Sequence, residues 1–105
     1  MEENQLKNVL ELHRKWINKE PGGERADLRG ADLRGANLDY SCWPLWCGSL
    51  DVRVCKRIAA QLAYHFCRLD CDDQEVIAAQ NAIIPLANQF HRVNECGKLE
   101  PKERK

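Results

Sequence analysis

The first twenty residues carry apolar side chains at helical spacing. The apolar stripe of this segment consists of Leu6, Val9, Leu10, His13, Trp16 and Ile17. Their spacing predicts an amphipathic helix from about residue 4 to residue 19. Pro21, Gly22 and Gly23 follow, and they predict its end. His13 falls on the stripe, where a buried histidine bonded to a carbonyl is a more ordinary role than a metal ligand.

The pattern then changes to a period of five residues. Residues 26–40 read ADLRG, ADLRG and ANLDY, three units of the form Ala-Asp/Asn-Leu-x-x. A period of five matches neither the 3.6 of a helix nor the 2 of a strand. It matches a chain that turns a corner every five residues, with Leu28, Leu33 and Leu38 pointing inward.

This repeat resembles that of pentapeptide-repeat proteins, whose right-handed β-helix places four such units in each square coil. The resemblance implies roughly one β-helix coil over residues 24–50. The unit at 41–45 is degenerate, with Trp43 in the leucine position, and the unit at 46–50 has lost the pattern. A single coil lacks the neighbours that bury its faces. We therefore expect Trp43 and Trp46 to plug it and the flanking helices to cover it.

The second half is predicted to be mainly helical. Residues 50–54 alternate apolar and polar, as in a short strand, and a helix is expected over 56–69. Asp72 or Asp73 can cap the next helix, which Pro85 kinks or splits, and Gly97 stops the last one. The charged tail 98–105 is expected to be loose. The prediction is a single α+β domain with four parts, 1–20, 24–50, 51–97 and 98–105.

Composition narrows the classes of partner. Sixteen basic and sixteen acidic side chains give the 105-residue chain a formal net charge of zero. Such a chain has no long-range field for DNA, RNA or an anionic membrane, and it does not imitate DNA. Met-Glu-Glu-Asn at the start is not typical of a secretory signal, and no apolar run reaches the roughly 18 residues of a membrane span. We expect a cytoplasmic protein.

Six cysteines in so short a chain point to metal binding, because disulfides are rare in a reducing cytoplasm. Cys47, His65, His91 and Cys96 are the candidate ligands of one structural zinc ion, which takes four Cys or His ligands. Such a zinc would join the coil exit to the C-terminal helices, where a small core needs a staple. The competing interpretation is that the histidines are hydrogen-bonded and the cysteines are packing residues or free thiols.

Three further points about the cysteines stay open. Cys42 can replace one of the four ligands, because it flanks the same Trp-Pro-Leu-Trp corner as Cys47. Cys67 and Cys71 either form a second site or are simply a pair at a helix end. Cys55 is taken as structural.

No motif of a catalytic zinc, a phosphate-binding glycine loop or a specified nucleophile is present, so the sequence predicts no enzyme. The segments KWI, GGER, CWPLWCGSL, YH, NQFHRV and ECG, together with the three repeats, are similar to small pentapeptide-repeat proteins of phages and prophages in Gram-positive bacteria. That resemblance implies an inhibitor of host defence, as in metal-binding anti-CRISPR proteins.

The expected partner is the effector nuclease of a type II-A CRISPR system, bound by protein–protein contact. The alternative is a structural or regulatory phage accessory protein that self-associates. The chain is expected to be a monomer or a small homo-oligomer. A zinc-containing nucleic-acid module is a weaker third interpretation, because base-reading residues are not concentrated anywhere.

Overall fold

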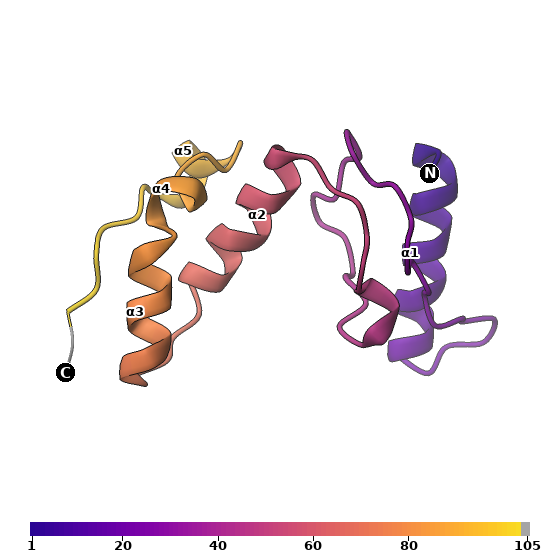
Figure 1. Cartoon of the computed structure of the whole chain (residues 1–105). Helices are drawn as coiled ribbons and strands as arrows, with labels where there is room; N and C mark the ends of the chain where they lie inside the picture. Colours follow the sequence, from indigo (N-terminus) through magenta and orange to yellow (C-terminus); the bar gives the residue numbers. More distant parts are fainter. Residues whose placement is uncertain (104–105) are drawn as a thin grey trace. The chain divides into compact units, whose positions relative to one another are not determined.

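The computed structural model describes residues 1–103 and divides into two compact units at Val54 and Cys55 (Figure 1). The sequence predicts one domain whose coil and helical parts meet at residues 50 and 51. The helices, in chain order, are α1 Glu3–Ile17, the 3-10 turn η1 Cys47–Ser49, α2 Lys56–Cys67, α3 Gln74–Ala82, α4 Ile84–Ala87 and α5 Val93–Cys96. Each unit is described by itself. Residues 104 and 105, the end of the tail expected to be loose, lie outside the described part.

The predicted N-terminal helix is confirmed as α1, which buries Leu6, Leu10 and His13. The chain leaves α1 through a close turn. Gly23 is required there, because a Cβ at this position would collide with the backbone of Lys15 and Trp16. His13 has the buried role expected of it, although its partner is an amide: its Nδ1 accepts a hydrogen bond of 3.1 Å from the N–H of Ala26.

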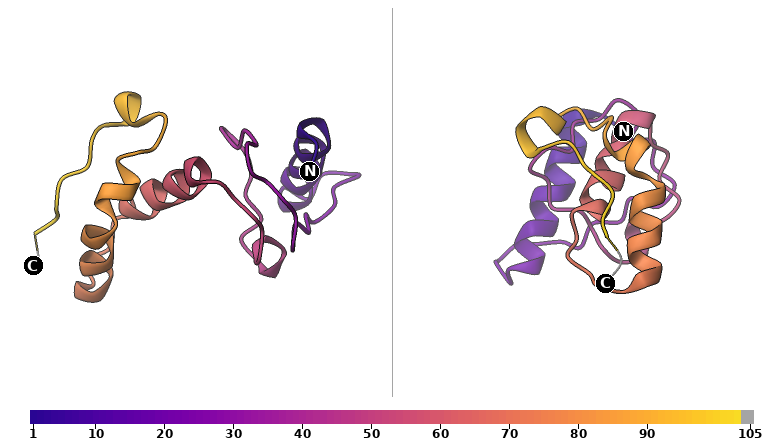
Figure 2. Two further views of the ribbon diagram at one scale, coloured as in Figure 1. Left: turned by 45° about the horizontal axis from the view of Figure 1, so that its top comes forward. Right: turned by 90° about the vertical axis from the view of Figure 1, so that its left-hand side faces the viewer.

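The prediction of a β-helix coil over residues 24–50 is wrong. In place of a coil, residues 26–41 form three successive turns, closed by backbone hydrogen bonds of 2.9–3.1 Å from the residue that follows each unit back to its leucine carbonyl. Between residues 1 and 103 the only ladder contact is an isolated parallel bridge of Asp32 with Arg53. The short strand expected at residues 50–54 is therefore wrong as well (Figure 2).

The reason is the small number of repeats. A β-helix forms when each coil hydrogen-bonds to the coil above and below it, and three units supply no second coil. The peptide groups are satisfied locally by the turns and by three bonds to residues 48–53: Leu28 N–H to Gly48, Leu33 N–H to Arg53, and Arg53 N–H to Ala31.

The inward placement of the repeat leucines is confirmed. Leu28, Leu33 and Leu38 expose 6% or less of their surface, and Leu33 exposes none. Trp43, expected inside with them, is only half-buried.

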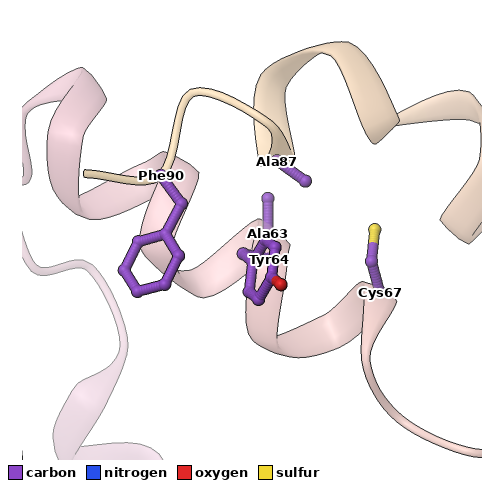
Figure 3. Packing of buried hydrophobic residues seen from close by; sticks show 5 residues of the cluster. All are labelled: Ala63, Tyr64, Cys67, Ala87 and Phe90. Carbon is purple, nitrogen blue, oxygen red and sulfur yellow. The ribbon is translucent and has the colours of Figure 1, made fainter. Parts of the chain in front are cut away.

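The C-terminal unit is built on α2. Its core cluster packs α2 against α4 and the residues after it, and consists of Ala63, Tyr64, Cys67, Ala87 and Phe90 (Figure 3). The rings of Tyr64 and Phe90 lie 4.9 Å apart. The predicted helix over 56–69 is thus confirmed, with its end at Cys67.

The residues predicted to begin and end the later helices are also confirmed. The carboxylate of Asp73 caps α3 by accepting bonds of 3.0 Å from the N–H groups of Glu75 and Val76. Pro85 splits the following stretch, so that α3 and α4 meet at Ile83. Gly97 ends α5 with a φ of 105°, which favours glycine. The tail expected to be loose is hydrogen-bonded at Leu99 and Lys102.

Replacing Leu33 with alanine should lower the free energy of unfolding by about 2–5 kcal/mol, because a fully buried leucine leaves a cavity. Urea denaturation followed by circular dichroism measures the change. Leu45→Ala is the matched control, since Leu45 is 92% exposed and its loss should change stability by less than about 0.5 kcal/mol. Equal effects of the two substitutions would contradict the inward placement of Leu33.

Candidate functional site

Two tryptophans and two arginines gather on the N-terminal unit. Trp16 lies in the last turn of α1, Trp46 just before η1, and Arg25 and Arg29 on the chain between them. The guanidinium of Arg25 lies 3.7 Å from the ring centroid of Trp46 and 5.9 Å from that of Trp16. Arg29 lies 5.8 Å from the ring centroid of Trp46. We call these four residues the arginine–tryptophan stack.

The Trp46 indole is fixed from two sides. Its Nε1–H donates a hydrogen bond of 2.7 Å to the carbonyl of Ala26, at the start of the first repeat unit. Gly48 lies so close to the indole that a Cβ at this position would overlap three of its ring atoms. Trp46 therefore presents its ring to Arg25 in one orientation.

The charges of the stack are unequal. Arg29 is paired with Asp27 by a salt bridge of 2.6 Å, and this hydrogen bond holds the pKa of the Asp27 carboxyl below its ordinary value. Arg25 has no carboxylate within 4 Å anywhere in residues 1–103. Its side chain is exposed, and Trp16 keeps 47% of its surface in solvent. Arg25 is thus a cation held on aromatic rings with its donors available to a partner.

The next repeat unit contains an equivalent arginine outside the stack. Arg34 pairs with Asp32 at 2.7 Å, as Arg29 does with Asp27, and the two arginines are 55% and 57% exposed. The hydrogen bond from Arg34 lowers the pKa of the Asp32 carboxyl in the same way. No ring contact joins Arg34 to a tryptophan in the described chain, so this arginine is a matched control for the stack.

The four predicted zinc ligands belong to different units. Cys47 begins η1 in the N-terminal unit, whereas His65, His91 and Cys96 belong to the C-terminal unit. All four side chains are exposed. His65 and His91 are brought together to the extent that both rings contact Phe90 edge-on, with centroid distances of 6.1 and 4.9 Å.

Within residues 1–103, no group of three or more His, Cys, Asp or Glu side chains is placed to hold a metal ion. The zinc site therefore stays a prediction. Cys42 and Cys55 are half-buried thiols, as is Cys71, whereas Cys67 is buried in the core cluster. Burial raises the pKa of the Cys67 thiol, which lies 3.4 Å from the carbonyl oxygen of Gln80 and donates to it. These contacts give Cys67 a packing role.

Sequence reasoning noted the tryptophans as core residues and missed Arg25. Trp46 was expected to plug the coil, yet its ring supports a surface cation. In the sequence, eight residues separate Trp16 from Arg25, and 20 separate Arg25 from Trp46. No local periodicity connects these positions, so the sequence alone does not mark the three residues as neighbours. Only the turn after α1 brings Arg25 to Trp16.

Gly48→Ala should disrupt the stack, because the new methyl group displaces the Trp46 indole from Ala26 and from Arg25. We expect a shift of the tryptophan fluorescence towards that of a water-exposed indole, with α1 and α2 retained by circular dichroism. Gly35→Ala is the control, because a Cβ there meets no atom within 4 Å and its φ of 78° strains only the turn of Arg34, which lies outside the stack. Identical spectra for the Gly48→Ala variant and the parent would contradict the fixed orientation of Trp46.

If Cys47, His65, His91 and Cys96 hold zinc, protein purified without added metal should contain one zinc per chain by elemental analysis. Cys96→Ser should lose the metal, whereas Cys71→Ser should keep it. Metal that survives Cys47→Ser and is lost on Cys42→Ser would make Cys42 the true ligand. A metal-free chain that is equally stable in a strong chelator would exclude the site.

No described helix combines the length and the hydropathy needed to cross a membrane. No family model, curated protein or solved structure matches the chain. Its function is therefore inferred from its own residues, of which the arginine–tryptophan stack is the strongest feature.

Proposed function

We propose that the chain acts by binding a protein partner through the arginine–tryptophan stack. The observation that supports this most directly is Arg25, which lies over Trp46 at 3.7 Å and has no ion pair in the described chain. Arginine and tryptophan are the residue types that most often carry the binding energy of interfaces. A guanidinium already stacked on an indole loses little rotamer freedom when it binds.

The chemistry of the stack favours a carboxylate on the partner. The planar guanidinium of Arg25 can donate two parallel hydrogen bonds to one carboxylate, and the exposed part of Trp16 adds apolar area beside it. Phosphate on DNA would need many more cations, whereas the chain has zero net charge. Binding should therefore depend only weakly on salt.

The partner proposed for this surface is the effector nuclease of a type II-A CRISPR system. Support comes from the resemblance of the repeat-containing sequence to small phage proteins and from the balanced charge, which favours contact with protein over occupation of a nucleic-acid channel. The chain would hinder DNA loading or a domain movement by contact away from the catalytic centres.

Self-association as a phage accessory protein is the second candidate. It is favoured by two apolar side chains that are almost fully exposed on the N-terminal unit, Tyr40 at 90% and Leu45 at 92%. Exposed apolar area of this kind is typical of surfaces that meet another chain.

Arg25→Gln should weaken binding to the purified effector nuclease by about 30-fold, which corresponds to the roughly 2 kcal/mol of an interface hot spot. Arg34→Gln should bind as the parent does, because that arginine lies outside the stack. Biolayer interferometry gives both affinities, and cleavage of a matched target with increasing amounts of each variant gives inhibition.

Equal binding by the two variants would exclude the stack as the contact. No binding to the nuclease or its guide complex, with undiminished cleavage at large molar excess, would exclude this partner. Sedimentation analysis of the parent and of Leu45→Ala then tests self-association.

A further inference from the structure

The tail of the C-terminal unit is held in extended form by side chains from α2 and α3 and from the residues that directly follow α2 and α4. Beyond Gly97 the residues up to 103 have no regular secondary structure. The carbonyl of Gly97 accepts a bond of 2.6 Å from the hydroxyl of Tyr64, and the carbonyl of Cys96 accepts one of 2.8 Å from Arg68. These bonds fix the start of the tail against α2.

Two asparagine side chains then hold the tail backbone in the same way. Asn88 accepts from the N–H of Leu99 at 2.8 Å and donates to the carbonyl of Leu99 at 3.2 Å. Asn81 accepts from the N–H of Lys102 at 2.8 Å and donates to its carbonyl at 2.9 Å. Each amide thus satisfies both main-chain groups of one tail residue, whatever side chain that residue carries.

The two asparagines hold tail residues that lie three positions apart. Asn81 belongs to α3 and Asn88 follows α4, on either side of the helix break at Ile83. Three residues of extended chain separate Leu99 from Lys102 and advance about 10 Å, at roughly 3.3 Å per residue. Successive contacts therefore fall on every third residue of the extended segment.

Two side chains of the tail contact the helical part of the C-terminal unit. Leu99 packs against the core cluster with Ile83 and Leu86. The ammonium of Lys102 donates to the carbonyl of Leu69 at 3.0 Å and to the Oε1 of Gln80 at 2.9 Å. The residues between them, Glu100 and Pro101, are exposed.

The tail does not fill the surface on which it lies. A hollow of about 390 Å³ remains between the end of α2, at residues 67–70, and the tail at residues 97–102. Because the asparagine contacts are to main chain, another extended segment could make them and also occupy this hollow.

We propose that this face of α2, α3 and α4 is a peptide-docking groove that its own tail occupies. Its partner is an extended segment of another protein with an aliphatic residue three positions before a lysine. Asn81 and Asn88 hold the backbone of that segment, the core cluster takes the aliphatic side chain, and Gln80 with the carbonyl of Leu69 takes the ammonium. The tail, attached through Gly97, is the competitor that the partner displaces.

The test uses the full-length chain and a labelled synthetic peptide of residues 97–103, which reproduces the known occupant. Leu99→Ser combined with Lys102→Gln weakens the tail and leaves the groove residues unchanged. Fluorescence anisotropy should show this variant binding the peptide at least 10-fold more tightly than the parent, whose tethered tail competes at high effective concentration.

Adding Asn81→Ala to the weakened-tail variant should reduce peptide binding at least 10-fold, whereas adding Asn94→Ala should not, because Asn94 is an exposed residue of α5 outside the groove. Asn88→Ala is the second groove variant if Asn81→Ala melts below the assay temperature. A peptide with the leucine and lysine exchanged should bind more weakly.

No binding to the folded weakened-tail variant, or binding insensitive to both asparagine substitutions, would overturn the proposal. Light scattering tests whether the parent chain forms a dimer that is lost on Asn81→Ala. Such a dimer would mean that the groove binds the tail of a second copy, and it would overturn the assignment to a separate partner. The groove and the arginine–tryptophan stack are tested separately, so neither result decides the other.

Discussion

The N-terminal unit depends on a side-chain acceptor at the second position of each repeat unit. Asp27, Asp32 and Asn37 each accept a hydrogen bond from the N–H two positions on, at 3.2, 3.1 and 2.9 Å. Such bonds satisfy the turn locally, so the leucines become buried without a sheet. Ala26, at the start of the first unit, donates to His13 and accepts from the Trp46 indole, and Arg25 just before it lies over that indole.

In the C-terminal unit, longer polar side chains form hydrogen bonds with main-chain groups at and beyond the helix ends. Gln80 is 1% exposed, and its amide nitrogen donates to the carbonyls of Phe66 and Leu69 at the end of α2, where Phe66 also accepts a backbone bond from Leu69. Asn81 and Asn88 hydrogen-bond main-chain groups of the tail in the same way. Buried polar groups must be paired, and in both units side chain to backbone bonds take the place of a β-ladder.

These facts explain what the sequence could and could not predict. α1, α2, a cap at Asp72 or Asp73 and a kink or split at Pro85 are predicted from local patterns, and the structure selects Asp73 as the cap and a split at Pro85. The β-helix coil was wrong because the pattern of residues 26–40 specifies a turn, and a coil also needs neighbours that only further repeats supply. Arg25 and the tail contacts were missed because they join residues from separate elements, and no period in the sequence marks them. The zinc ligands remain a hypothesis from residue type alone.

The third repeat unit shows how far burial outweighs local preference. Gly30 and Gly35 occupy the corner of the first two units at φ of 73° and 78°, where glycine is favoured. Tyr40 occupies the same corner in the third at φ of 62°, at a cost of about 1 kcal/mol relative to glycine. The turn survives because Leu38 stays buried and Asn37 keeps its bond to the N–H of Asp39. The repeat therefore specifies a corner with an inward leucine, and that corner forms whether or not a second coil exists to extend it.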